Sequence, residues 1–172
     1  MVFLIAIIVL VAVILIYAAT KPDTFHVERS IKIKASPEKI FALISDFHHW
    51  DEWTPYNKDP AMKKTYSGSS SGKGAMFAWE GNKEVGKGEI SITSTMPPNK
   101  VELDLHMIKP FEGRNVVVFS LNAAEDSTSI TWGMDGKQAF FVKVMGLFMN
   151  MDNMVGKDFA VGLAKLKAIA EE

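Results

Sequence analysis

The sequence predicts an α+β fold in which a curved antiparallel sheet wraps around a long C-terminal helix, preceded by one separate apolar helix. Three observations support this prediction. The first nineteen residues carry no charge. Residues 66–134 contain short stretches in which apolar and polar side chains alternate, separated by turn residues, and one apolar stripe runs through the last thirty residues. A chain of 172 residues is long enough for one domain with a sizeable core and a short extra element.

Composition excludes several classes of function. The net charge is −1 and both signs are mixed along the chain, so no basic run or patch supports nucleic-acid binding. Cysteine is absent, which excludes disulfides and thiol chemistry.

The N-terminal segment, residues 1–19, predicts a transmembrane anchor. Nineteen helical residues span about 28 Å, close to the roughly 30 Å hydrocarbon core of a bilayer. No Lys or Arg precedes the apolar run, and Tyr17 stands where a cleavable signal peptide usually has a small residue. We therefore expect a retained single-pass anchor rather than a signal peptide.

The anchor is followed by a short linker, residues 20–24, and then by a domain over residues 25–172. Basic residues on this flank favour the cytoplasmic side for the domain under the positive-inside rule. They are Lys21, Arg29, Lys32 and Lys34.

The first strand of the domain has one unusual position. Val27, Ile31 and Ile33 alternate with polar residues, but Arg29 shares the parity of the apolar side chains. Arg29 lies either at the edge of the strand or inside a cavity as an inward cation. An unpaired buried charge is costly, which favours the edge position, but the residues leave both interpretations open.

A helix follows the first strand. Ser36 and Pro37 have the residue types of an N-cap and a first helical position. A second short helix or turn is expected over residues 46–56, closed by Pro55.

Consecutive strands joined by turns predict an antiparallel, strongly bent sheet. Gly86 and Gly88 indicate a bulge or bend in the sheet. Residues 96–99 indicate a turn, and His106 falls on the exposed face of its strand. The inward rows are Ala75, Phe77 and Trp79; Ile90 and Ile92; Val101, Leu103, Leu105 and Met107; Val117, Phe119 and Leu121; and Ile130, Trp132 and Met134.

The last thirty residues predict a short helix followed by a long one. Gly146 and Gly156 interrupt the run, since glycine weakens a helix interior. A stripe this wide needs a large concave partner, which the sheet can provide. The stripe consists of Phe141, Met145, Phe148, Met151, Val155, Phe159, Gly162, Leu166 and Ile169.

Two motifs invite a chemical interpretation that we do not favour. The ionisable cluster of residues 46–52 has a spacing that allows a metal or an acid–base pair, but it matches no established zinc motif, so a solvated turn around Trp50 and Trp53 is the better interpretation. The stretch from Gly68 to Lys73 has three residues between its glycines rather than the four of a phosphate-binding loop. We therefore expect no metal, no cofactor and no catalytic residue.

The motifs together resemble the SRPBCC or START-like superfamily, in its polyketide cyclase/dehydrase branch, over about residues 25–171. This resemblance implies a helix-grip fold with a deep hydrophobic cavity between the sheet and the long helix. Proteins of such folds include lipid carriers, aromatase/cyclases and hormone receptors, so the fold implies no single activity. The resemblance rests on Ser36-Pro37-Glu38, Phe41, Trp50, Trp53-Thr54-Pro55, Trp79, Thr131-Trp132, and Gly162-Leu163 with Leu166-Lys167.

The residues alone leave open whether this interior is a packed core or a ligand cavity, and the resemblance favours a cavity. Several methionines, a residue type that lines adaptable apolar pockets, occur around the end of the last strand and the start of the long helix. The candidate lining residues share the inward parity of their elements. They are Trp79, Leu105, Phe119, Trp132, Met134, Phe148 and Met151, together with Arg29.

Three functions fit these observations. We favour a membrane-tethered binding protein for a hydrophobic small molecule or lipid, because an anchor raises the local concentration of lipophilic ligands. The alternatives are a polyketide cyclase/aromatase-like enzyme, which needs inward polar groups to move protons, and a non-catalytic regulatory module for a membrane partner. The sequence indicates no particular protein partner.

Overall fold

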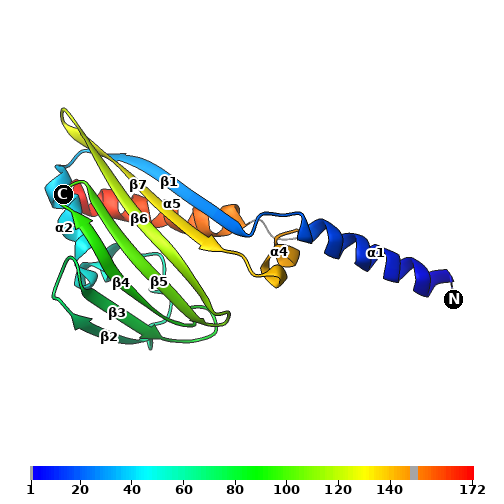
Figure 1. Ribbon diagram of the computed structural model, residues 1–172. Helices are drawn as coiled ribbons and strands as arrows, with labels where there is room; N and C mark the ends of the chain where they lie inside the picture. The colour runs from blue at the N-terminus through cyan, green and yellow to red at the C-terminus, as the bar shows by residue number, and fades with distance from the viewer. Residues whose placement is uncertain (1, 148–150) are drawn as a thin grey trace.

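The computed structural model describes residues 2–147 and 151–172, and it confirms the predicted α+β architecture (Figure 1). A curved sheet covers the long helix α5, and the apolar helix α1 extends from one end of the domain. The helices are α1 (Val2–Ala19), α2 (Pro37–Ser45), η1 (Phe47–His49), α3 (Trp50–Trp53), α4 (Phe140–Gly146) and α5 (Met151–Ala170). The strands are β1 (Thr24–Ile33), β2 (Lys63–Gly68), β3 (Ala75–Glu80), β4 (Lys87–Met96), β5 (Lys100–Lys109), β6 (Gly113–Ala124) and β7 (Ser127–Lys137).

The sheet is antiparallel throughout its described strands, in the order β1-β7-β6-β5-β4-β3-β2. Sequential strands from β2 to β7 are neighbours, as expected for strands joined by short turns, while β1 pairs with the last strand. The register shifts between Lys87 and Gly88, where Gly86 has a φ of 66°. The bend predicted from the two glycines is therefore confirmed.

The N-cap prediction for α2 is confirmed. The Ser36 hydroxyl accepts a hydrogen bond from the backbone N–H of Lys39 at 3.3 Å, and Pro37 occupies the first helical position.

The two tryptophans of α3 bind to the end of α2 through their indole N–H groups. Trp50 Nε1 donates to the Ile44 carbonyl at 3.1 Å, and Trp53 Nε1 donates to the Leu43 carbonyl at 3.2 Å. Both rings are buried, and their N–H groups are satisfied by the end of α2.

The C-terminal segment forms a short helix and then a long one, as predicted. Gly156 nevertheless lies within the continuous α5, so the expectation that it interrupts the helix is wrong. A Cβ atom at this position would lie 2.1 Å from Arg29 Nη2, so the glycine makes room for a side chain of β1. Of the predicted stripe, Phe148 lies outside the described residues, as does the side chain of Met151.

Helix α1 is long and apolar enough to cross a membrane, a criterion that a signal sequence near an N-terminus also meets. Most of its side chains are exposed, whereas Ala18 is fully buried. Helix α4 contacts α1, so the short helix lies against the domain-proximal end of the apolar one (Figure 1).

Candidate functional site

The candidate site is the aromatic interior between the sheet and α5. Phe119 of β6 and Trp132 of β7 are neighbours in the register, and both are almost fully buried. The Trp132 ring stacks on Phe159 of α5, with ring centroids 4.1 Å apart, and meets Trp53 edge-on at 5.6 Å. Two of the predicted lining residues are thus brought together, at the centre of a tightly packed group of rings.

Trp79 lies in a second aromatic row that is connected to the first. Its ring stacks on Phe77 at 5.8 Å, and Phe77 lies 6.0 Å from Phe47 of η1, which in turn contacts Trp50. Trp79 is half-buried, and its indole N–H donates to the Val85 carbonyl at 3.1 Å. Rings therefore line the interior continuously from β3 to α5.

The remaining predicted lining residues differ in their burial. Met134 is buried close to the end of β7, while Leu105 on β5 is only partly buried and packs against the core. Phe148 and the Met151 side chain lie outside the described part of the chain. That they line a ligand cavity therefore stays a prediction.

The Trp132 indole nitrogen is buried, and among the described residues no hydrogen-bond acceptor reaches it. A buried N–H group without a partner costs about 1–3 kcal/mol, and most buried polar groups in proteins are therefore paired. The interior thus has an unused donor, which a ligand with an acceptor oxygen can satisfy.

Tyr56 borders the same group of rings, and sequence reasoning did not single it out. Its ring centroid lies 6.5 Å from that of Trp132. Burial of the hydroxyl raises the pKa of Tyr56, and the negative charge of Asp158 acts in the same direction, although 39% of the residue remains exposed. The phenol therefore stays protonated at neutral pH, as a hydrogen-bond donor. The one sequence signal for its location beside these rings is its position directly after the Trp53-Thr54-Pro55 segment.

Arg29 combines features of both interpretations considered for it. It lies on β1, an edge strand of the sheet, and its side chain points toward α5. Its guanidinium contacts both carboxylate oxygens of Asp152 at 2.9 and 3.0 Å, and the Asp152 carbonyl at 3.1 Å. The hydrogen bonds from Arg29 hold the pKa of Asp152 below its usual range. Arg29 therefore connects β1 to the first turn of α5, and its charge is paired.

The ionisable cluster of residues 46–52 forms the solvated turn that we favoured. His48 contacts Asp46 at 2.7 Å, His49 contacts Glu52 at 3.0 Å, and Asp51 pairs with Lys64 of β2 at 2.6 Å. Within residues 2–147 and 151–172, no three His, Asp or Glu side chains are grouped so that they would hold a metal ion.

The exposure predicted for His106 is wrong. Only 16% of its side chain is accessible, because the longer side chains of Glu89, Glu112 and Arg114 cover it. Its place on the outer face of β5 is nevertheless consistent with its parity, since its partners Glu89 and Arg114 lie on the two flanking strands.

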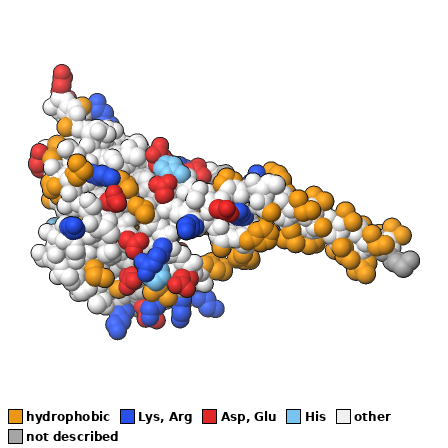
Figure 2. All heavy atoms as spheres, in the orientation of Figure 1, with side chains coloured by type: hydrophobic (Ala, Val, Ile, Leu, Met, Phe, Trp, Pro, Cys, Tyr) orange, Lys and Arg blue, Asp and Glu red, His pale blue; other side chains and the backbone are white. Residues whose placement is uncertain are grey.

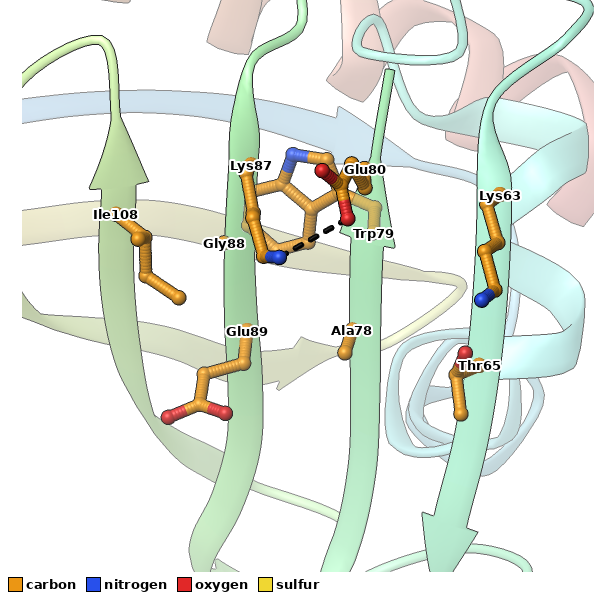
Figure 3. A pocket seen from close by; sticks show the side chains of 9 residues that line it. All are labelled: Lys63, Thr65, Ala78, Trp79, Glu80, Lys87, Gly88, Glu89 and Ile108. Carbon is orange, nitrogen blue, oxygen red and sulfur yellow. Dashed lines mark hydrogen bonds and ion pairs between the residues drawn. The ribbon is translucent and has the colours of Figure 1, made fainter.

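A shallow groove crosses the face of the sheet that is turned away from α5 (Figure 3). Its floor is formed by small residues on neighbouring strands, Ala78 and Gly88, and by part of Trp79. Charged side chains line its rim, including the ion pair between Lys87 and Glu80 at 2.9 Å. The groove is open and polar, unlike the apolar cavity that the family resemblance implies.

Several solved structures share the fold of this chain. A chain of 11% identity, the di-domain ARO/CYC BexL from the BE-7585A biosynthetic pathway, superposes with a TM-score of 0.62, covering 91% of this chain and 53% of that one. Ginseng major latex-like protein 151 from Panax ginseng is 12% identical, with a TM-score of 0.63 over 88% of this chain and 100% of its own. The Aha1 dimer from Colwellia psychrerythraea is 18% identical, with a TM-score of 0.59 over 86% of this chain and 96% of its own.

Identities this low show the fold alone. Among curated protein sequences, none matches this one. The profile of one family, described as polyketide cyclase / dehydrase and lipid transport, matches residues 24–171, which is nearly the whole chain outside α1. The chain belongs to the polyketide cyclase/dehydrase and lipid transport family.

Proposed function

We propose that this protein is a membrane-anchored binding protein for a hydrophobic small molecule or lipid, held between the concave face of the sheet and α5. The observation that carries the proposal is the buried N–H of Trp132, which has no hydrogen-bond partner among the described residues and lies within a mostly apolar aromatic interior. Such an environment favours a ligand that is mostly apolar and has one acceptor oxygen, as in a quinone, a fatty acid or an ester.

The packing of the rings sets a condition on uptake. Trp132 and Phe159 are in direct contact, so a ligand that reaches the indole N–H must displace one ring or separate α5 from β7. The N-terminal turn of α5 is held to β1 by the contact between Arg29 and Asp152, so separating α5 from the sheet also requires breaking this ion pair.

The anchor supports the same function. Helix α1, as a retained membrane span, would keep the domain next to a bilayer in which lipophilic ligands are concentrated. The basic residues after α1 support a cytoplasmic domain. Protease accessibility in sealed vesicles of known orientation tests that assignment.

The enzymatic alternative is a cyclase/aromatase-like activity, which the family description also covers. A proton-transferring group on the inward face is required for it. Arg29, the inward candidate from the sequence, is engaged by Asp152, which favours binding without catalysis.

Native mass spectrometry of the full chain in detergent, followed by lipid extraction, tests the proposal. We expect a bound lipophile with an acceptor oxygen, retained less well by Trp132→Phe, which keeps an aromatic ring but removes the N–H. Gly146→Ala is the matched control, because a Cβ at that position has no neighbour within 4 Å among the residues that the structure describes. A protein that stays empty when quinones, fatty acids and phospholipids are added would overturn the proposal.

A further inference from the structure

Three phenylalanines are exposed at the end of the domain that is nearest to α1. Phe111, in the turn between β5 and β6, is 60% exposed, and Phe140 and Phe141 of α4 are 49% and 53% exposed. The rings of Phe111 and Phe141 are in contact, with centroids 5.6 Å apart, although the residues are far apart in the sequence. Exposed apolar side chains gathered in this way mark an interaction site. We call Phe111, Phe140 and Phe141 the phenylalanine patch.

The patch is attached firmly to the domain-proximal end of α1. Lys143 of α4 is almost fully buried; its ammonium group donates to the Lys21 carbonyl at 3.0 Å and forms an ion pair with Asp23. Both partners lie in the linker after α1, and Ala18 in the last turn of α1 is fully buried. In the space-filling view, the hydrophobic surface of α1 continues onto this end of the domain (Figure 2).

A row of positive charge lies beside the patch. The register of the sheet places Lys63 opposite Glu80, Glu80 opposite Lys87, and Lys87 opposite Lys109, across β2, β3, β4 and β5. Three lysines and one glutamate give this row a net charge of +2 (three minus one). Lys109 stands two residues before Phe111, so the row ends next to the exposed rings, where the exposed Glu112 contributes one negative charge.

We propose that this end of the domain lies directly on an anionic lipid bilayer, with the phenylalanine patch in the interfacial region and the lysine row at the phosphate groups. This inference rests on the proposed function, because it takes α1 as a membrane span. Phenylalanine is among the apolar residues that membrane-surface segments bury at the boundary between headgroups and acyl chains, and lysines near a bilayer are attracted to anionic headgroups. Continuity with α1 selects the bilayer of the anchor itself, rather than a protein partner, as the occupant of this surface.

Docking differs from simple tethering in a measurable way. A domain connected only through a linker would sample many orientations, whereas a docked domain keeps the β5–β6 turn at the bilayer and the β6–β7 turn away from it. The two turns lie at opposite ends of the sheet (Figure 1). The depth of each turn therefore reports docking.

Single cysteines provide the probes, because the natural chain has none. We would introduce Leu10→Cys in α1, Glu112→Cys beside Phe111, or Glu125→Cys in the β6–β7 turn, and label each with an environment-sensitive fluorophore. The full chain is then reconstituted into phosphatidylcholine vesicles containing phosphatidylglycerol and lipids with a quencher near the headgroup or in the acyl chain. We expect quenching at position 10 by the acyl-chain quencher, at position 112 by the headgroup quencher, and at position 125 by neither.

The outcomes separate the two proposals. If position 10 is quenched but position 112 is quenched no more than position 125, docking is overturned and the anchor is left intact. A lack of quenching at position 10 would overturn the anchor and docking together. Phe111→Ser with Phe141→Ser should lower the quenching at position 112 to the level of position 125, and vesicles without phosphatidylglycerol should lower it in the unsubstituted protein. Met96→Ser, at an equally exposed apolar residue at the other end of the sheet, should have no effect.

Discussion

The rings of Trp132 and Phe159 lie nearly parallel, with an interplanar angle of 11° and centroids 4.1 Å apart. This contact joins the last strand of the sheet to the middle of α5, and both side chains are almost fully buried. Under the proposed function, a ligand that reaches the Trp132 N–H must also disturb this contact. The proposal therefore makes stability and ligand binding depend on the same pair of residues.

Trp132→Ala should reduce the free energy of unfolding by about 3–5 kcal/mol, because a large buried aromatic side chain is removed. Trp132→Phe should cost less than Trp132→Ala, since it keeps a ring and removes an N–H that has no partner among the described residues, and burial of such a group itself costs about 1–3 kcal/mol. Urea unfolding in detergent, followed by circular dichroism of the domain, measures both. If ligand retention in Trp132→Ala is unchanged while stability falls, Trp132 is a core residue and no part of a ligand site.

Gly162→Ala should destabilise the protein even though alanine is the better helix former. The added Cβ would lie 2.8 Å from the Trp132 ring and 3.0 Å from Pro55 Cδ, and neither group is free to move in a packed interior. We expect a loss of roughly 1–3 kcal/mol in the free energy of unfolding. Gly146→Ala, whose added Cβ meets no described residue within 4 Å, serves as the control and should be neutral or slightly stabilising. Equal effects at the two positions would contradict the close contact between α5 and Trp132.

His26 should make stability depend on pH. Hydrogen bonds to Asp135, at 2.7 Å, and to Glu28 raise the pKa of His26 in the folded state. Because the folded pKa is raised, the stabilisation is fully present below the unfolded pKa of about 6.5 and is lost as the pH rises through the folded value. The melting temperature should therefore fall over this interval. Asp135→Asn removes the main partner and should flatten the profile; an unchanged profile would show that this interaction contributes nothing.

Asp23→Asn should release α4 from the linker. Lys143 is buried against Asp23, and removal of the carboxylate charge leaves the buried ammonium group without this counter-charge, with only neutral acceptors such as the Lys21 carbonyl in its place. Hydrogen exchange of the α4 amides should become faster, as measured by mass spectrometry of peptides covering residues 140–146. Glu84→Gln, which affects only an exposed and long ion pair with Lys58 at 3.8 Å, is the control. Equal protection of α4 in Asp23→Asn and in the control would show that this ion pair does not hold α4 in place.

The architecture of the domain was predictable because it depends on local patterns. Apolar and polar residues alternate along β4 to β7, and this alternation shows which side chains point inward. Ser36 and Pro37 identify the start of α2. Such signals are contained in a few neighbouring residues, so they can be read without knowing how the chain folds back.

The contacts that define the candidate site are not local. Arg29 and Asp152 are separated by 123 positions, and the sequence showed only that Arg29 had the parity of an inward residue. Similarly, the low helix propensity of Gly156 suggested an interruption, whereas its role is to admit the Arg29 guanidinium. The burial of Lys143 by the linker could not be predicted from the sequence either. A lysine at the fourth position of a short helix has no local feature that distinguishes it from an exposed lysine. Pairings of this kind depend on the final arrangement of β1, α4 and α5, which no single window of sequence contains.

The shortness of the connection between α1 and β1 has a consequence for how the protein can work. Residues 20–23 separate the two elements, so the last residue of α1 and the first residue of β1 are five steps apart and at most about 18 Å from each other. If α1 spans a bilayer, the domain has no reach to a second membrane, and its search for ligand is confined to the plane of one leaflet. Such a protein would pass a lipophile sideways to neighbours in its own membrane, and its rate would depend on its surface density rather than on its concentration in solution.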